Sequence, residues 1–237
     1  SVGGVARDPQ GNFVVVWDSA GSWGTDNDSY SIQARSYSDG GTPVGEDFQI
    51  NTYTTGDQFL AKVASDAEGN FVVVWGSRGS WGSNTDMSSV QVRRFRAEGT
   101  PLDPAEFQVN TYTTGNQIAC GLSSDAQGNF VVVWLSAGSS GTDDDGYSIQ
   151  ARRFAATGAP LDSVEFQVNV FTTGSQYSPV VASEPSGDFV VVWESYGSFG
   201  SDFSYSSIQA RRFSKTGDPV DVREFQVNVY TPWIQQL

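Results

Sequence analysis

The most regular feature of the chain is a run of five apolar residues that occurs four times. Each run reads Phe-Val-Val-Val-Trp, and the runs lie at residues 13–17, 71–75, 130–134 and 189–193. Apolar residues at successive positions are typical of a strand covered on both faces, whereas a half-exposed strand alternates. We therefore expect each run to form a strand that lies between neighbouring layers.

Three further landmarks accompany each run. A Gly-bearing turn precedes it, a segment of the form Ile/Val-Gln-Ala/Val-Arg follows it, and the unit ends in Phe-Gln-Ile/Val-Asn. The tryptophans of the runs are 58, 59 and 59 residues apart. Such a period is the signature of a repeat architecture. We divide the chain into units at approximately 1–56, 57–115, 116–174 and 175–231, followed by a tail at 232–237.

Each unit contains four strand candidates, rich in β-branched and aromatic residues and bounded by turns. In the second unit they are residues 60–65, 70–77, 89–96 and 106–111. No segment shows the 3.6-residue apolar period of a helix. Four antiparallel strands in each of four units predict an all-β fold with minimal helix, a four-bladed β-propeller.

The first strand candidate of each unit is rich in small residues, which fits a place where innermost strands converge. The first unit begins on its first strand and the last unit ends on its fourth. No blade is thus expected to combine strands from both ends of the chain, and closure rests on blade packing. A monomeric four-bladed ring, a dimer that forms an eight-bladed ring and a fragment of a longer array stay open.

The charge balance narrows the range of partners. The chain has 27 acidic and 13 basic residues and no histidine, a formal net charge of −14. Nucleic acids and anionic membranes attract positive surfaces, so we expect neither as a partner. No apolar run approaches the roughly 18–20 residues that a membrane helix needs, so we expect no membrane insertion. The chain begins at Ser1 in mid-pattern, which we interpret as a mature product or an excised fragment.

The connection between the second and third strands carries the candidate ligand-binding residues. An aromatic residue stands at one position in three of four units, beside glycine in a polar loop. Such a ring could stack against a sugar, with nearby carboxylates and amides binding hydroxyls; alternatively it covers the edge of its own blade. The candidates are Trp23, Trp81, Phe199, Asp26, Asn84, Asp143 and Asp202.

The same loops contain Asp-x-Asp pairs. Calcium takes about six to eight oxygen ligands, including carboxylates, so Asp26 with Asp28 and Asp143 with Asp145 are candidate metal ligands. The alternative is that these residues make hydrogen bonds within their own turns. No loop shows the ligand spacing of an EF-hand. The sequence thus requires no cofactor, and calcium is the one that it admits.

Catalytic signals are weak. Without histidine, Ser-His-Asp and Cys-His mechanisms are excluded. The acid before each second strand and the arginine on each third strand recur in every unit, which favours a structural role. A glycosidase uses two carboxylates, and the positions that depart from the repeat offer Asp18 and Glu194, with Tyr196 two residues later. We predict no catalytic residues beyond that conjecture.

The phrases Gly-Asn-Phe-Val-Val-Val-Trp, Tyr-Ser-Ile-Gln-Ala-Arg-Arg-Phe and Phe-Gln-Val-Asn-Thr-Tyr-Thr-Thr-Gly resemble a tandem repeat of bacterial exported surface proteins. The resemblance covers residues 11–231. It implies an extracellular or cell-surface location and an adhesive or binding role, and it brings no established activity and no functional residues.

These observations favour a non-enzymatic, lectin-like extracellular module whose repeated loops bind a surface glycan, with avidity from several similar sites. The alternative is a structural repeat whose partner is a protein, and oligomer formation fits either hypothesis. A carbohydrate-active enzyme that uses the asymmetric acids is the third hypothesis.

Overall fold

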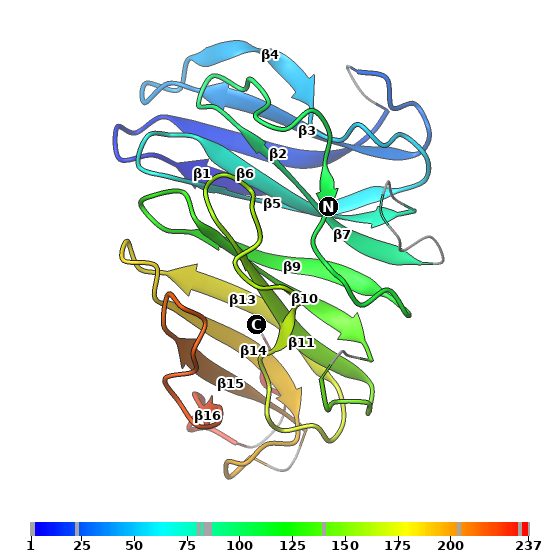
Figure 1. Ribbon diagram of the computed structural model, residues 1–237, viewed down its shortest axis with the longest axis vertical. Helices are drawn as coiled ribbons and strands as arrows, with labels where there is room; N and C mark the ends of the chain where they lie inside the picture. The colour runs from blue at the N-terminus through cyan, green and yellow to red at the C-terminus, as the bar shows by residue number, and fades with distance from the viewer. Residues whose placement is uncertain are drawn as a thin grey trace.

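The computed structural model describes residues 3–21, 24–79, 82, 87–138, 141–202, 205–231 and 234–236, without the side chains of residues 119 and 120. This part of the chain forms four separate four-stranded sheets, each antiparallel and each in sequence order (Figure 1). It contains no helix, and hence none long and apolar enough to cross a membrane.

The four sheets are the four blades. Blade 1 contains β1 (Gly4–Arg7), β2 (Phe13–Ala20), β3 (Tyr30–Tyr37) and β4 (Pro43–Gln49). Blade 2 contains β5 (Gln58–Ser65), β6 (Phe71–Arg78), β7 (Ser88–Phe95) and β8 (Phe107–Gln108). Blade 3 contains β9 (Gln117–Ser124), β10 (Phe130–Ala137), β11 (Tyr147–Phe154) and β12 (Phe166–Gln167). Blade 4 contains β13 (Gln176–Ser183), β14 (Phe189–Tyr196), β15 (Ser206–Phe213) and β16 (Phe225–Gln226).

The predicted all-β, four-bladed β-propeller is confirmed. The first strands of consecutive blades pack against one another, β1 on β5, β5 on β9 and β9 on β13. The Phe-Val-Val-Val-Trp runs form the second strands, and Trp75, Trp134 and Trp193 are fully buried. Their successive apolar residues are explained by the two sheets that cover β6 and β10.

The fourth strands of blades 2 to 4 are shorter than expected. Residues 106–111 were predicted to form a strand, but β8 comprises only Phe107 and Gln108. The ladder stops because a side chain replaces the next backbone partner: Asn110 Oδ1 accepts the Val90 amide at 2.9 Å. The asparagine that ends each Phe-Gln-Val-Asn segment is therefore the terminator of the sheet.

Three apolar clusters join consecutive blades, one at each junction. In each cluster aliphatic side chains of one blade pack against two phenylalanines, a valine and the tryptophan of the next. At the junction of blades 2 and 3, for example, Val72, Val74 and Val90 contact the cluster that contains Phe130 and Trp134. The core therefore lies between the sheets, where burial of apolar surface favours the stacked arrangement.

A polar latch accompanies each cluster. Glu106 of blade 2 accepts the backbone amides of Thr52 and Tyr53 at 2.8 and 2.6 Å. Arg93 of blade 2 donates to the Ile50 carbonyl at 2.7 Å. Burial lowers the pKa of Arg93, and the nearby carboxylates of Glu106 and Asp103 oppose that shift. Both charged groups therefore bind the backbone segment that leaves the preceding blade.

The latch recurs at the other two junctions. Glu165 with Arg152 binds the segment that leaves blade 2, and Glu224 with Arg211 binds the segment that leaves blade 3. The recurring acid before each second strand is equally structural. Asp125 accepts the Asn129 amide at 2.9 Å and its side-chain amide at 2.7 Å, which closes its own turn.

Replacing Glu165 with Gln tests the latch. The substitution turns one oxygen that accepts an amide into a donor, so it leaves a partly buried N–H without its partner. We expect the free energy of unfolding to fall by about 2–3 kcal/mol, measured by urea denaturation. The control is Glu68→Gln on an exposed turn residue, which should change it by less than about 0.5 kcal/mol. Equal losses in the two variants would contradict the latch.

Candidate functional site

The structure places the predicted loop aspartates inside the fold. Asp26, Asp143 and Asp202 are buried at equivalent positions of three blades. Asn51 donates to Asp26 at 2.6 Å, and Asn169 donates to Asp143 at 2.6 Å. These are the asparagines of the Phe-Gln-Val-Asn segments, so each aspartate ties its loop to the end of its own sheet.

Burial sets the protonation behaviour of two of these aspartates. Desolvation raises the pKa of Asp26 and of Asp143 above the usual value, and the hydrogen bonds from Asn51 and Asn169 oppose the shift. The negative charges of Asp28 and Asp145 raise it further. The loop carboxyls are therefore coupled to folding through their burial.

The second aspartate of each pair holds a neighbouring loop. Asp28 accepts the Gly56 amide at 3.1 Å, and Asp145 accepts the Gly174 amide at 3.0 Å. Both glycines adopt positive φ in the segment that follows the fourth strand. No group of three acidic, histidine or cysteine side chains that could hold a metal occurs among the residues placed in the structure. Calcium binding stays a prediction.

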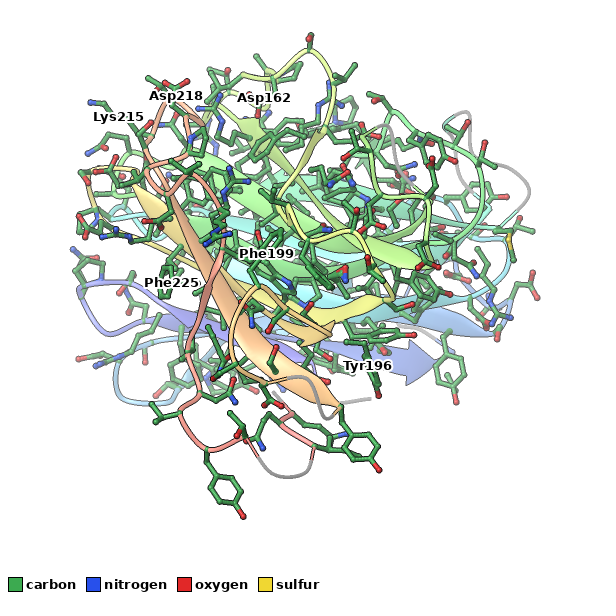
Figure 2. The ribbon with its side chains drawn as sticks, turned by 90° about the horizontal axis from the view of Figure 1, so that it is seen from below. Asp162, Tyr196, Phe199, Lys215, Asp218 and Phe225 are labelled. Atoms are coloured by element: carbon green, nitrogen blue, oxygen red, sulfur yellow. The ribbon has the colours of Figure 1, made fainter. Side chains whose placement is uncertain are left out.

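Of the predicted aromatic platforms, Phe199 is the one that the structure describes; Trp23, Trp81 and Asn84 lie outside the described residues. Phe199 is half-exposed (Figure 2) and packs edge-on against Phe171 of blade 3, with ring centroids 5.2 Å apart. The Arg223 guanidinium lies 5.0 Å from its ring centroid. The ring thus contacts protein on more than one side, and its role as a sugar platform stays a prediction.

A depression of about 390 Å³ lies where the four first turns meet. Asp8, Asp66 and Asp125 contribute to its lining from three blades, and Pro185 contributes from the fourth. Arg7 also lines it, at the position that serine occupies in the other blades. Each aspartate accepts hydrogen bonds within its own turn. The acids of this depression are therefore structural and recur in three blades, and Arg7 is the one lining residue of positive charge, present in blade 1 alone.

A cluster of three tyrosines lies on blades 3 and 4, at the end of the strands remote from the first turns. The Tyr177 ring is 5.7 Å from the Tyr147 ring and 5.6 Å from the Tyr196 ring. Tyr177 is the register partner of Glu194 on β14, and Tyr196 is exposed at the end of that strand (Figure 2). The cluster therefore combines apolar ring surface with a carboxylate.

Asp18 occupies on blade 1 the position that Glu194 occupies on blade 4. Its two oxygens accept the amides of Leu60 and Ala61 on blade 2, at 3.1 and 3.3 Å. Leu60 has φ of 58°, and Ser178, its counterpart beside Tyr177, has φ of 50°. Residues other than glycine rarely adopt a positive φ. Backbone strain of this kind clusters at functional sites. The strain lies in the β-bulges of β5 and β13.

The sequence identified part of this site. Asp18, Glu194 and Tyr196 stood out as departures from the repeat, although only as a conjecture. Tyr147 was missed because Tyr30 precedes the same segment in the first unit, so its position does not depart from the repeat. Tyr177 was missed because the equivalent residues, Phe59 and Ile118, are also apolar. Only the fold brings the three rings together.

Comparison with known proteins finds similarity of structure. No family profile matches the sequence, and no curated protein is similar to it. A protein of unknown function from Dyadobacter fermentans is 13% identical, with a TM-score of 0.55 over 90% of this chain. The α-L-arabinanase of Penicillium chrysogenum is 12% identical, with a TM-score of 0.61 over 94%. The GH93 α-L-arabinofuranosidase of Fusarium graminearum is 10% identical, with a TM-score of 0.58 over 94%.

This chain spans 65% of the length of each of these three proteins. At such identities the similarity establishes the β-propeller fold and does not transfer an activity.

The expectation of a non-enzymatic, lectin-like module, or of a purely structural repeat, is contradicted. Two of the similar structures are carbohydrate-active enzymes, an arabinanase and an arabinofuranosidase. The repeated loops had directed the interpretation towards several equivalent binding sites. In the structure, their recurring aspartates accept hydrogen bonds from the asparagines at the ends of the sheets, and so hold the loops to the sheets.

Replacing Asp143 with Asn tests the coupling between the loop and folding. Because the pKa of Asp143 is raised, the folded protein keeps a proton that the unfolded chain has released. The carboxyl therefore favours folding below its unfolded pKa, and that contribution is lost as pH rises through the raised pKa. We expect the free energy of unfolding of the wild type, minus that of the variant, to decrease over this range. Blade 2 carries Asn84 at this position, so the variant should fold.

Urea denaturation of both proteins from about pH 3 to pH 7 measures the difference. Asp144→Asn, at the exposed neighbour, is the control and should show a smaller dependence. A difference that is constant with pH, or that increases, would contradict the raised pKa.

Proposed function

We propose that this chain is a carbohydrate-active enzyme, a glycosidase that binds its glycan on the tyrosine cluster of Tyr147, Tyr177 and Tyr196. The observation that carries the proposal is the contact of these rings beside Glu194, where Glu194 and Tyr196 of blade 4 depart from the repeat. The similar fold of an arabinanase and an arabinofuranosidase makes an arabinose-containing glycan the first substrate to test.

The tyrosines supply the binding surface. A sugar ring presents C–H groups on its faces and hydroxyls at its rim, and a tyrosine offers an apolar face together with a polar hydroxyl. Tyr196 is exposed, whereas Tyr177, which contacts it, and Tyr147 are half-buried. Tyr177 packs edge-on against Tyr196 and holds it in place, so that a sugar stacks on a preorganised surface.

Glu194 supplies a carboxylate beside the cluster. Hydrolysis of a glycosidic bond uses one carboxylic acid that protonates the leaving oxygen and a second carboxylate that acts as nucleophile or activates water. Glu194 is buried beside the tyrosine cluster, which suits the proton donor. Asp18 lies on blade 1, where both of its oxygens accept amides of blade 2, so we assign it no catalytic role.

The setting that fits this function is extracellular. A large polymer such as a plant or surface glycan is met outside the cell. The strongly acidic composition, with a net charge of −14, suits a secreted protein. The glycan is then the partner that the surface residues contact.

Release of reducing sugar from linear arabinan measures the activity. Glu194→Gln should lower kcat by about 100-fold or more, because it removes the proton donor. The control is Glu46→Gln at an exposed residue of β4, which should keep wild-type turnover.

Tyr196→Ala separates binding from chemistry. Loss of one stacked ring should raise KM by about tenfold, with a smaller effect on kcat. Circular dichroism of each variant shows whether the sheets are intact. Turnover by Glu194→Gln at the wild-type rate would refute the assignment of the acid, and a wild type that hydrolyses neither arabinan nor a panel of other glycans would refute the function.

A further inference from the structure

A second exposed aromatic ring lies near the tyrosine cluster, in the loop that follows β14. Phe199 is three residues beyond Tyr196, so the Cα atoms of the two residues are at most about 11 Å apart. Both residues belong to blade 4 (Figure 2), and the structure leaves Tyr196 44% exposed and Phe199 45% exposed. The two rings are therefore close enough for one oligosaccharide chain to contact both.

Each exposed ring packs against an inner ring in the same geometry. Tyr177 packs against Tyr196 with ring centroids 5.6 Å apart and an interplanar angle of 81°. Phe171 packs against Phe199 with ring centroids 5.2 Å apart and an interplanar angle of 87°. Edge-to-face contacts of this kind are favourable for aromatic rings. In both pairs the inner ring therefore holds the outer ring in a defined orientation.

One segment of the chain carries both inner rings. It begins at Phe171, after the last strand of blade 3, and ends at Tyr177 on β13. A Cβ atom added to Gly174, in the middle of this segment, would lie 3.0 Å from the Tyr196 carbonyl oxygen. A Cβ atom added to Gly197 would lie 3.0 Å from the Phe171 ring. The two ring pairs thus share one support, and the close contact of the backbones sets the spacing between them.

Hydrogen bonds fix the loop that carries Phe199. The hydroxyl of the buried Ser198 accepts the Gly200 amide at 3.0 Å and donates to the Asp202 carbonyl at 3.4 Å. Gln226 of β16 accepts the Asp202 amide at 3.2 Å. A ring on a loop of this kind loses little conformational entropy when a ligand binds, which favours affinity.

An arginine adds hydrogen-bond donors beside Phe199. The Arg223 guanidinium lies 5.0 Å from the centroid of the Phe199 ring. Arg223 is exposed, and its guanidinium forms no ion pair with the residues that the structure describes. Its neighbour Glu224 accepts the Phe171 amide at 2.7 Å, which places this arginine at the junction of blades 3 and 4. The five N–H groups of a guanidinium suit the hydroxyls at the rim of a sugar ring.

This combination of residues is peculiar to blade 4. Arg223 stands where blades 2 and 3 carry Ala105 and Val164. Among the four units, blade 4 alone combines an aromatic residue at the Phe199 position with a cation at the Arg223 position. Like the glutamate and the tyrosine of the proposed site, the pair is thus a departure from the repeat.

We propose that Phe199 and Arg223 form a second binding position for the same glycan, so that the site takes an oligosaccharide chain instead of a single sugar unit. The inference rests on the proposed function, because the first position is the tyrosine cluster beside Glu194. One sugar unit stacks on Tyr196, and a further unit of the chain contacts Phe199 while Arg223 donates to its hydroxyls. Longer chains are therefore the better substrates, since binding energy at a remote position contributes to the rate of the reaction.

Hydrolysis of linear arabino-oligosaccharides, from the disaccharide to the hexasaccharide, tests the second position. For the wild type, kcat/KM should increase with chain length until both positions are filled. Phe199→Ser should lower kcat/KM for the hexasaccharide by about tenfold, and the loss should shrink as the chain becomes shorter. Blade 3 carries serine at this position, so the variant should fold. Phe199→Trp, with the residue of blades 1 and 2, should keep the wild-type dependence on length.

The matched control is Tyr30→Ala, at a tyrosine of blade 1 that is 46% exposed; it should keep the wild-type kcat/KM at every chain length. A wild type that hydrolyses the chains, together with a Phe199→Ser variant whose loss is equal at every length or absent, would overturn the second position and leave the proposed function standing. A wild type that hydrolyses no glycan would overturn both.

Discussion

The latch between blades is the interaction on which the rest of the molecule depends. A buried arginine and a buried glutamate of one blade bind the carbonyl and the amides of the chain as it leaves the preceding blade. Sheets that pack only through apolar side chains could slide, because the hydrophobic effect has no direction. Charge-assisted hydrogen bonds to fixed backbone atoms do have direction. The latch therefore sets how each blade lies on the one before it.

The same logic explains the loops that connect the second and third strands. A buried aspartate accepts from the asparagine that ends the sheet, and the next aspartate accepts from the glycine of the segment that follows. An acidic loop that looked suited to a ligand is in this way used to hold two connections together. Burial raises the pKa of the first aspartate, so the stability of the loop depends on whether that carboxyl is protonated.

A catalytic function, by contrast, requires residues at positions where the four units differ. Four equivalent positions on a propeller give four equivalent environments, whereas catalysis needs two acids in different roles. The proposed site uses such a departure from the repeat, Glu194 beside the tyrosine cluster.

The sequence by itself determined the repeat, the four strands of each unit and the propeller, because apolar runs, turn residues and spacing are local properties. It also indicated that the recurring acid and arginine are structural. It did not determine the length of the fourth strand, where the Asn110 side chain replaces a backbone partner, or the burial of Asp26 and Asp143. It did not reveal that Tyr147 and Tyr177 meet. These features depend on contacts between residues 20 to 30 positions apart, or on different blades, and only the packing of the sheets creates such contacts.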